Sequence, residues 1–441
     1  MIIWGRNGDG PMKKQISFPG ALRSRRRKTL PANGGRHIQQ GKGKWGTLLA
    51  LILVLLSFAA LGESAEEITS RCELTPASNK KKFDRALDDN YRTYWNSSAG
   101  KGAAIGVKAP DGEEIGAVWF QWYEHPHAAA VQVMQGGEWT DLGVTEGAFL
   151  SECVELPEGV TECRIANPKT ARKSTPLPIA EMHVYSAGEL PENVQRWRAP
   201  CEKADLMLLA GHPDDELLWF GGILPFYAGV QEKAVQVCIM VPTLPRRRLE
   251  ELDGLWTCGV RNYPVFGYFR DSFSLSAKDQ YARWGEKGVN KLVTGWIRRF
   301  RPDVIITHDF KGEYGHGAHQ VCADAAVKAL DFAADPKQFP DSRQEYGTWD
   351  VPKCYIHLYP EGQIDFDWRI PLDRFGGKTA FDVASEAFYC HVSQRHTEYR
   401  VEDSGPCDCS LFGLYRSLVG PDEEKNDLFE HLPAYLVTEA D

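Results

Sequence analysis

The sequence predicts two folded regions, an all-β sandwich followed by a doubly wound α/β domain with a mostly parallel sheet. The first region has short apolar runs that are broken by Gly, Asn, Asp and Pro, a pattern typical of antiparallel strands. The second region alternates apolar runs with stretches of helical periodicity, as expected when helices cover both faces of a parallel sheet. The predicted segments are a leader over 1–65, the sandwich over 66–188, a linker over 189–203 and the α/β domain over 204–441.

Short strands are expected throughout the first region. The clearest runs are Gly102–Val107, Ile115–Tyr123, Ala130–Met134 and Ile179–Tyr185. Strands of this length at this spacing indicate an antiparallel sandwich. The stretch Gly188–Pro200 contains two prolines and several charges, so we expect it to connect the two regions.

The second region contains three apolar runs that predict strands covered on both faces. These runs are Asp205–Ala210 (DLMLLA), Ala234–Val241 (AVQVCIMV) and Asp303–Thr307 (DVIIT). The helix-like stretches between and after them are Leu217–Ala228, Leu249–Cys258 and Val289–Phe300. This order predicts a Rossmann-like domain, in which ligands bind beyond the carboxyl ends of the strands.

Charge is divided unevenly along the chain. Residues 1–44 carry a net charge of +10, which leaves −19 for the remainder because the whole chain carries −9. An acidic body argues against binding of a nucleic-acid backbone as the main role.

The basic start precedes the apolar run Trp45–Gly62, a pattern typical of a secretory leader. We expect export, with cleavage near Ala65 favoured over an uncleaved anchor because the run is a little short for a membrane span.

Eleven cysteines are scattered through the chain. The pairs Cys153/Cys163 and Cys407/Cys409 are close enough in sequence to close small loops as disulfides. Buried thiols are the alternative, since free cysteine is among the most buried residue types. Pairs of the C-x-x-C type are absent, so a structural zinc site of that kind is not predicted.

A polar motif, Gly211–Glu216 (GHPDDE), directly follows the first strand of the second region. One interpretation is helix capping, since Pro213 suits a first helical position and acids complement the positive helix end. Capping requires one acid, however, and this motif has three behind a histidine. His212 and Asp215 are three residues apart across a strand-to-helix turn and can face one ion. That arrangement leaves Asp214 available as a base.

A second polar motif, His308–His319 (HDFKGEYGHGAH), follows the third strand. His316 and His319 are three residues apart at the start of a predicted helix, Gln320–Leu330, so they can share one face. This motif and the first lie at the same predicted sheet edge. Two imidazoles and a carboxylate with an open position for water describe a catalytic zinc site. Iron(II) accepts the same ligands.

The two motifs together resemble the PIG-L/LmbE-like family of zinc-dependent N-acetylglucosamine deacetylases, over about residues 204–394. The resemblance implies three metal ligands: His212, Asp215 and His319. It implies that Asp214 is the general base and that His316 assists at the carbonyl oxygen or the leaving amine.

Weaker parts of the resemblance concern the substrate. Arg247 lies in a pattern similar to the family's arginine-containing helix, which helps to hold substrate, although three consecutive arginines are also typical of a solvated face. Asp271 falls where the family often has an acid that contacts substrate. His391-x-Ser393-Gln394 resembles a further family pattern without a clear duty.

One position departs from the family pattern. Many relatives have Asp just before the last histidine of the second motif, and this chain has Ala318. The implied ligands are unaffected, but the pKa of His316 becomes harder to infer. Asp309 and Glu313 are the candidates to replace the missing carboxylate.

The first region also resembles a known module. Asp88–Trp95 and Ile179–Ser186 are similar to the opening and closing stretches of discoidin-like (coagulation factor 5/8 type C) sandwiches. Such modules often bind sugars, sometimes with a structural calcium ion near the opening acidic loop. Asp88 and Asp89 are the calcium candidates, although an Asp-Asp-Asn turn needs no ion.

These observations predict an exported zinc hydrolase that deacetylates N-acetylated amino sugars, with the sandwich docking on the glycan. The expected partner is an amino sugar or glycan, with no nucleic acid and with membrane contact only through an uncleaved leader. One alternative is a zinc amidase for another N-acyl compound. The other is a glycan-binding adhesin with an inactive α/β domain, but none of the three implied ligands has been lost.

Overall fold

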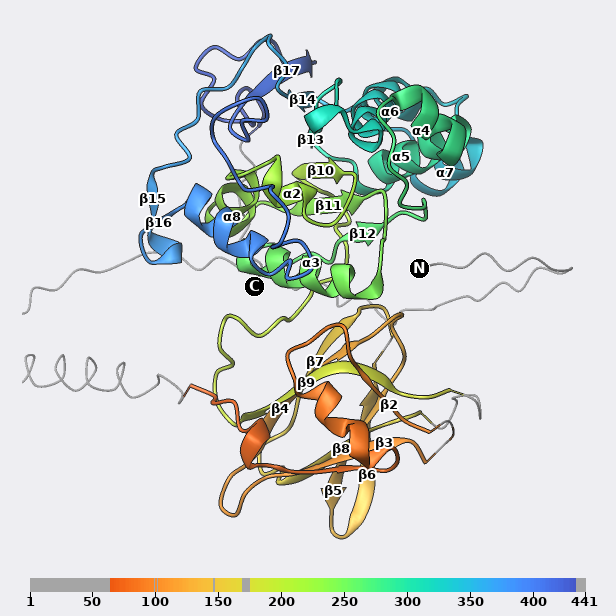
Figure 1. The fold of residues 1–441 in the computed structure, drawn as a ribbon, viewed down its shortest axis with the longest axis vertical. Helices are drawn as coiled ribbons and strands as arrows, with labels where there is room; N and C mark the ends of the chain where they lie inside the picture. The colour runs from red at the N-terminus through yellow and green to blue at the C-terminus, as the bar shows by residue number, and fades with distance from the viewer. Residues whose placement is uncertain (1–63, 99, 101, 146, 169–174, 434–441) are drawn as a thin grey trace, which may run out of the picture. The chain divides into compact units, whose positions relative to one another are not determined.

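The computed structural model describes residues 64–433, apart from residues 99, 101, 146 and 169–174 (Figure 1). Residues 1–63 of the predicted leader, including its apolar run Trp45–Gly62, lie outside the described residues. Within the described ranges, every helix is too short or too polar to cross a lipid bilayer.

The first described region is an antiparallel sandwich, as the sequence predicts. Its elements are η1 (Thr69–Arg71), β1 (Glu73–Pro76), η2 (Lys80–Ala86), β2 (Trp95–Asn96), β3 (Ala104–Lys108), β4 (Ile115–Trp122), β5 (Ala130–Gln135), β6 (Glu138–Val144), β7 (Ser151–Glu155), β8 (Glu162–Ala166) and β9 (Pro178–Ser186). One sheet has the order β1-β3-β8-β5-β6 and the other β2-β9-β4-β7, and all strand pairs are antiparallel. The four predicted strands correspond to β3, β4, β5 and β9.

All eleven cysteines lie among the described residues, and all are free thiols. The pairing of Cys153 with Cys163 is therefore wrong: Cys153 lies on β7 in one sheet and Cys163 on β8 in the other. Cys407 and Cys409 are unpaired too, and Cys409 packs in the core of the second region.

The second region contains a six-stranded sheet. Its strands are β10 (Leu206–Ala210), β11 (Val235–Ile239), β12 (Val265–Phe266), β13 (Val304–Thr307), β14 (Lys353–His357) and β17 (Phe412–Ser417). The spatial order is β12-β11-β10-β13-β14-β17, parallel except for β17, which runs antiparallel to β14. The order reverses between β10 and β13, so these two strands flank the point where ligands bind in doubly wound folds.

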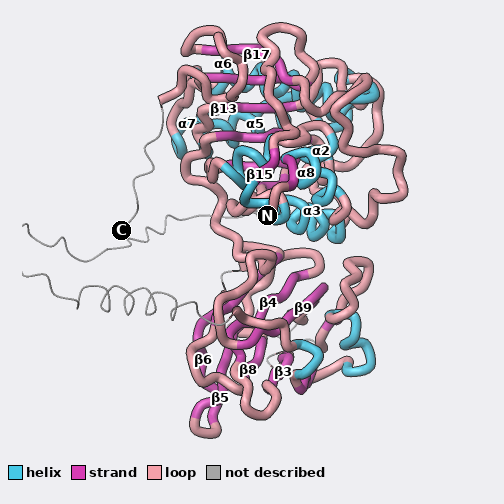
Figure 2. The backbone as a smooth tube through the Cα atoms, turned by 90° about the vertical axis from the view of Figure 1, so that its left-hand side faces the viewer, coloured by secondary structure: helices cyan, strands magenta, loops and turns pink. Residues whose placement is uncertain are grey.

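Helices cover both faces of this sheet (Figures 1 and 2). On one face lie α2 (Asp215–Leu218), a π-helix (Pro225–Val230), α3 (Pro245–Thr257) and α8 (Ala380–Phe388); on the other lie α4 (Ala277–Trp284), α5 (Glu286–Phe300) and α6 (Gly317–Ala334), with α7 (Pro340–Tyr346) against α5. Smaller elements are η4 (Glu313–Gly315), η5 (Asp373–Phe375) and the hairpin β15 (Pro371–Leu372) and β16 (Lys378–Thr379). Successive side chains of β10 pack alternately into the two hydrophobic cores on opposite faces of the sheet. This double burial explains the uninterrupted apolar sequence of the strand.

The single helix predicted over Leu217–Ala228 is wrong. The chain forms the short α2, then a turn, and then the π-helix. Gly221 has φ +43°, a left-handed conformation, and a Cβ there would lie 2.6 Å from the Sγ of Cys409. A Cβ on Gly222 would lie 2.5 Å from the ring of Trp368. Segments from the far end of the chain therefore pack against this turn, a contact that helical periodicity does not reveal.

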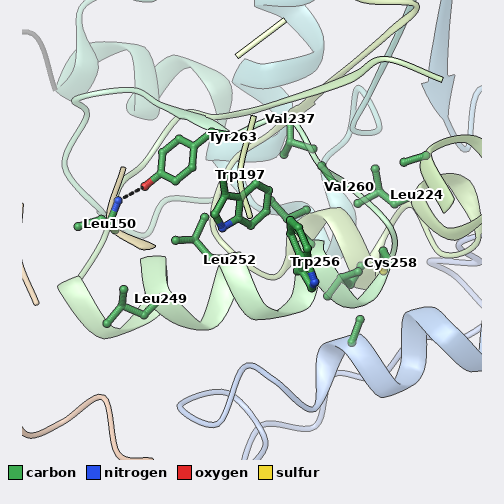
Figure 3. Close-up of a cluster of buried hydrophobic side chains, with 14 of the residues drawn as sticks. Leu150, Trp197, Leu224, Val237, Leu249, Leu252, Trp256, Cys258, Val260 and Tyr263 are labelled. Atoms are coloured by element: carbon green, nitrogen blue, oxygen red, sulfur yellow. Dashed lines mark hydrogen bonds between the residues drawn. The ribbon is translucent and has the colours of Figure 1, made fainter. Parts of the chain in front are cut away.

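The segment predicted as a linker packs tightly against the second region. The ring of Trp197 lies 5.2 Å from that of Trp256 and 5.6 Å from that of Tyr263 (Figure 3). The Tyr263 hydroxyl accepts a hydrogen bond of 2.9 Å from the backbone N–H of Leu150, in the sandwich. Trp197, within the segment predicted as a linker, is therefore part of the hydrophobic core.

Candidate metal centre

The two polar motifs meet at the carboxyl ends of β10 and β13. The first motif follows β10, and the second follows β13 and leads into α6. Because β10 and β13 are hydrogen-bonded neighbours, the structure brings His212, Asp215 and His319 together from segments about a hundred residues apart. All three side chains are buried.

The side chains of this cluster stand close enough to hold a divalent metal ion. The ligand atoms of His212, His316 and His319 lie within 4.8 Å of one another, and so do those of Asp215, His308 and His319. Asp215 Oδ2 lies 3.2 Å from His212 Nδ1 and 3.2 Å from His319 Nε2. Ligands about 2.0–2.1 Å from a tetrahedral zinc ion stand roughly 3.3 Å apart, close to these separations. Both ring nitrogens of His319 are buried without a well-formed hydrogen bond, although carboxylate oxygens lie nearby. The residues present therefore fit zinc.

A layer of hydrogen bonds fixes the carboxylate of Asp215. Its Oδ2 accepts from the backbone N–H of His212 at 2.7 Å, and its Oδ1 accepts from the indole of Trp219 at 2.9 Å. Burial alone would raise the pKa of Asp215, but His319 and His212 hold it well below its ordinary value. The group is therefore an anion, as a metal ligand must be.

Glu313 orients the imidazoles from behind. Its Oε2 lies 2.7 Å from His308 Nδ1 and 2.8 Å from His319 Nδ1, and its Oε1 lies 2.5 Å from His357 Nδ1. Such outer carboxylates set the tautomer of metal-binding histidines. Glu313 and Asp309 are the two candidates to replace the carboxylate missing at position 318. Glu313 contacts His319. Within the described residues, neither candidate is hydrogen-bonded to the imidazole of His316.

His308 is a neighbour of the cluster that the sequence did not single out. Its Nε2 lies 3.6 Å from Asp215 Oδ2, and its ring stacks on that of His319 at 4.1 Å. However, Nε2 accepts a hydrogen bond of 3.1 Å from the backbone N–H of Gly211. Its lone pair is thereby used, so His308 supports the site and does not compete as a ligand.

Asp214 lies beside the ligand cluster in a strained conformation. Its φ of +104° is rare for any residue except glycine, and its side chain makes no helix-capping bond. The capping interpretation, which the sequence argued against, does not hold for Asp214, and Pro213 lies two residues before the first helical residue. The Asp214 carboxylate instead pairs with Arg247 at 2.8 Å, and its backbone N–H donates to Glu216 at 2.9 Å.

The environment of Asp214 sets its proton affinity. Burial raises its pKa to about 6, and the guanidinium of Arg247 opposes this rise. Arg247 also donates to the backbone carbonyl of Pro213. Arg247, predicted to hold substrate, thus lines the pocket and contacts the Asp214 carboxylate and the backbone beside it.

His316 lies next to the ligands with its ring 5.0 Å from that of His212. Burial, together with the neighbouring charges of His319 and His212, lowers the pKa of His316 to about 3. The imidazole is therefore neutral near pH 7. The hydroxyl of Tyr314 lies 3.3 Å from its Nδ1, which places the ring proton on Nε2 when that hydroxyl donates.

A pocket of about 150 Å³ opens above these residues. It is lined by the following residues: His212, Asp214, Asp215, Leu218, Trp219, Arg247, Asp271, Phe273, Tyr314, His316, Gln394 and Tyr399. Asp271 is half-exposed at 3.7 Å from His212 Nε2, so both predicted substrate residues lie at this pocket. His319 is buried beneath it.

Sequence reasoning missed the aromatic walls of this pocket. Phe273 stacks on His316 from one side, and Tyr314 stacks on Tyr399 on the other, with ring centroids 5.3 and 4.9 Å apart. Tyr314 lies inside the second motif and Trp219 four residues after Asp215, so both could have been found from spacing. Phe273 and Tyr399 come from loops with no signal of their own.

The pattern His391-x-Ser393-Gln394 forms part of the support of the site. Glu250 accepts hydrogen bonds from the backbone N–H and the hydroxyl of Ser393, at 2.9 and 2.5 Å. His391 Nε2 lies 3.4 Å from Glu216 Oε1, and Glu216 holds the backbone of Asp214. These buried groups connect α3 and the segment after α8 to the backbone of Asp214.

The calcium candidates lie elsewhere, in the sandwich. Asp88 accepts from the backbone N–H of Asn90 and from the hydroxyl of Thr93, as in a turn that needs no ion. Asp89 groups with Glu181 and His183, whose ligand atoms lie within 4.8 Å of one another. Calcium prefers oxygen ligands, so this group with an imidazole fits it poorly. Calcium binding remains a prediction.

Comparisons with known proteins agree with the site. Residues 207–330 match the family model PIG-L: GlcNAc-PI de-N-acetylase. A 1D-myo-inositol 2-acetamido-2-deoxy-alpha-D-glucopyranoside deacetylase 1 from Frankia casuarinae is 30% identical over 200 residues, which cover 38% of this chain and 64% of the relative. A protein of the same description from Catenulispora acidiphila is 29% identical over 38% of this chain and 59% of the relative. The chain thus spans about three-fifths of the curated relatives it matches.

The chain also has partial matches among solved structures. N,N'-diacetylchitobiose deacetylase from Pyrococcus horikoshii is 18% identical, with a TM-score of 0.34 over 44% of this chain and 72% of that one. The family 32 CBM of NanJ from C. perfringens, in complex with galactose, is 16% identical, with a TM-score of 0.23 over 27% of this chain and 98% of that one. From the family model and the motifs that it spans, we conclude that the chain carries a PIG-L/LmbE-type domain.

Proposed function

We propose that this protein is a zinc-dependent hydrolase that removes the acetyl group from an N-acetylated amino sugar. The observation that carries this proposal is the cluster His212, Asp215 and His319, with the carboxylate of Asp214 beside it and a pocket above. The deacetylase descriptions of the matched family and relatives support the same reaction class.

The donor set supplies the chemistry of a hydrolytic centre. A zinc ion held by His212, Asp215 and His319 would polarise the amide carbonyl and acidify the attacking water. Asp214 accepts the proton of that water, and its pKa of about 6 suits a base that works near neutral pH. Arg247 holds the carboxylate of Asp214 in place for this transfer.

His316 has a different role because it is neutral. With Nδ1 next to the Tyr314 hydroxyl, the Nε2 proton is available to the developing negative charge on the carbonyl oxygen. The protonated Asp214 then returns its proton to the leaving nitrogen. The products are a free amine and acetate.

The pocket suits a sugar. Its walls carry Phe273 and Tyr399, whose side chains are 62% and 38% exposed, and exposed aromatic rings stack on the apolar faces of sugars. Asp271 and Gln394 supply polar groups at the mouth. An N-acetylglucosamine-type unit is the substrate that this combination favours over an acylated peptide.

Two measurements test the proposal. Purified protein should contain about one zinc ion per chain and release acetate from N-acetylglucosamine oligomers or N-acetylglucosaminyl-inositol. Dipicolinate should abolish acetate release, and added zinc should restore it. Protein that binds zinc but releases no acetate from any N-acetylated sugar would contradict the proposal, and so would protein that stays metal-free in zinc-replete medium.

Two further proposals concern the rest of the chain. We propose that the sandwich binds glycan and so keeps the catalytic region close to its substrate, which a glycan array probed with the full chain can test.

We also propose that the protein is exported, because a basic leader precedes an apolar run. Fractionation of cells and sequencing of the mature amino terminus would test export, and retention of uncleaved protein in the cytosol would contradict it.

A further inference from the structure

A second pocket, larger than the one at the metal centre, lies at the other end of α3. Its volume is about 540 Å³. Arg247, near the start of α3, faces the metal centre, whereas Trp256, near its end, lines this second pocket. The two residues are nine positions apart, which corresponds to roughly 14 Å along the helix. The two pockets are therefore separate, and they share no lining residue.

Positive charge is concentrated around this second pocket. Five cationic side chains line it: Arg196, Arg198, Lys233, Arg261 and Arg374. Two acids accompany them, Glu192 and Glu232, so the lining carries a net charge of +3. We call this second pocket the arginine pocket. Its net charge is positive, although the chain beyond residue 44 carries a net charge of −19.

Three of the five cations are partly neutralised or used in the fold. The ammonium of Lys233 lies 4.7 Å over the ring of Phe429. Arg374 lies 3.3 Å from Glu232, and Arg261 donates to the backbone carbonyls of Trp256 and Val260. Burial lowers the pKa of Arg261 to about 10, and the nearby charges of Arg374, Arg198 and Arg196 add to the effect. The arginines therefore repel one another, and an anion between them would relieve that repulsion.

Arg196 and Arg198 are the cations left available. Within the described part of the chain, neither side chain makes a hydrogen bond or an ion pair, and both are exposed. Their backbone is nevertheless fixed, because the Arg198 N–H donates to Arg261 at 2.9 Å and the Tyr263 N–H donates to Arg198 at 2.9 Å. Trp197, between them, is anchored in the core. The two guanidinium groups thus project from a rigid base.

We propose that the arginine pocket binds the phosphoryl group of a small phosphorylated molecule about the size of a sugar. Guanidinium groups present paired N–H donors that match phosphate oxygens. A net charge of +3 balances a phosphate dianion better than a single carboxylate. Free phosphate would fill only a small part of 540 Å³, which is within the range of small-molecule sites. The neutral part of the ligand would occupy the remaining volume.

Calorimetric titration of the full chain tests this site. The probes are glucose 6-phosphate, inorganic phosphate and, as the neutral control, glucose. We expect glucose 6-phosphate to bind, with an affinity that decreases as sodium chloride is added. The double variant Arg196→Ala/Arg198→Ala should weaken binding roughly tenfold or more, because it removes two charged donors. Arg283→Ala is the matched control, since Arg283 is exposed on α4 and lines neither pocket.

The outcomes separate the sources of the phosphoryl group. Tighter binding of glucose 6-phosphate than of phosphate assigns the site to a phosphorylated sugar, and equal binding assigns it to free phosphate. The proposal is overturned if neither probe binds at ~10 mM. It is also overturned if Arg283→Ala weakens binding as much as the double variant does, or if binding disappears with EDTA, which would place the anion at the metal centre. Deacetylation can fail in its own assay without affecting these results.

Discussion

At the scale of single residues, the candidate base Asp214 has a strained backbone conformation. A residue with a Cβ at φ +104° is unfavourable by roughly 1–3 kcal/mol, and such strain persists only where neighbours enforce it. Here Glu216 holds the backbone N–H, while Arg247 holds the carboxylate and the preceding carbonyl. In this conformation the carboxylate lines the pocket beside His212 and Asp215.

Replacement of this carboxylate should separate catalysis from metal binding. Asp214→Asn tolerates the same backbone conformation and retains the ligands, so zinc content should not change. Loss of the base should lower kcat roughly 10²–10⁴-fold, measured by acetate release beside metal analysis. Asp214→Ala should behave similarly, and Asp111→Ala, at an exposed position in the sandwich, is the control. Full activity in both Asp214 variants would remove this residue from the mechanism.

The carboxyl group of Glu181 should make the free energy of unfolding depend on pH. Burial, with the nearby charge of Asp89, raises the pKa of Glu181 from 4.5 to about 8. The folded protein therefore binds this proton more tightly than the unfolded chain, so the free energy of unfolding should decrease as pH rises from about 4.5 to 8.

Glu181→Gln removes this titration while keeping an oxygen for the backbone N–H of Asp89. The variant should gain stability over wild type at pH 8 and lose that advantage near pH 4.5. Urea unfolding at both pH values, in EDTA, measures the difference. Glu158→Gln, at an exposed position, should follow wild type. An equal gain at both pH values would show that proton binding is not the cause.

At the scale of elements, the break between α2 and the π-helix shapes the second region. The glycines at this break admit Cys409 and Trp368, which come from segments almost two hundred and one hundred and fifty residues later in the chain. The same later part of the chain supplies β17, the antiparallel edge strand of the sheet. The described residues from Glu402 onward thus complete the sheet and pack behind the first motif.

Two glycine substitutions should therefore have opposite effects. A Cβ at Gly222 would lie 2.5 Å from the ring of Trp368, so Gly222→Ala should destabilise the protein by about 1–3 kcal/mol. A Cβ at Gly295, inside α5, would have no other atom within 4 Å. Gly295→Ala should stabilise by about 0.5–1 kcal/mol because alanine favours helix. Urea unfolding measures the change in stability of both variants. An equal change in the two would contradict the packing argument.

At the scale of the whole molecule, one hydrophobic cluster includes residues from both regions. Buried side chains of the sandwich, of the segment around Trp197 and of α3 belong to it together. Polar contacts add to this cluster: the Tyr91 hydroxyl donates to Asp253 on α3 at 2.7 Å, and Gln195 donates to the same carboxylate at 2.6 Å. We infer that the sandwich and the α/β domain stabilise each other.

Tyr263 provides a test of this coupling. Tyr263→Phe keeps the ring but leaves the N–H of Leu150 buried without its acceptor (Figure 3). An unsatisfied buried donor costs about 1–3 kcal/mol, so the midpoint of urea unfolding should decrease accordingly. Tyr268→Phe is the control, because Tyr268 is 65% exposed. A Tyr263→Phe variant as stable as the control would indicate that this contact contributes nothing.

Much of this protein could be predicted from local sequence. Apolar runs predicted the central strands, because residues buried on both faces leave an uninterrupted signal in the sequence. The histidine and aspartate motifs indicated the ligand cluster, because parallel strands bring the loops at their carboxyl ends to a common edge. The residues His212, Asp215 and His319 are within reach of one ion for this reason.

Tertiary structure alone decided the rest. The broken helix, the role of the described residues from Glu402 onward and the aromatic walls at Phe273 and Tyr399 depend on contacts between segments far apart in the chain, which periodicity cannot encode. The arginine pocket likewise gathers side chains from four separate segments, none of which stands out by its own charge. Local patterns determine which residues form strands and which can bind a metal, whereas packing determines which distant side chains share a cavity with them.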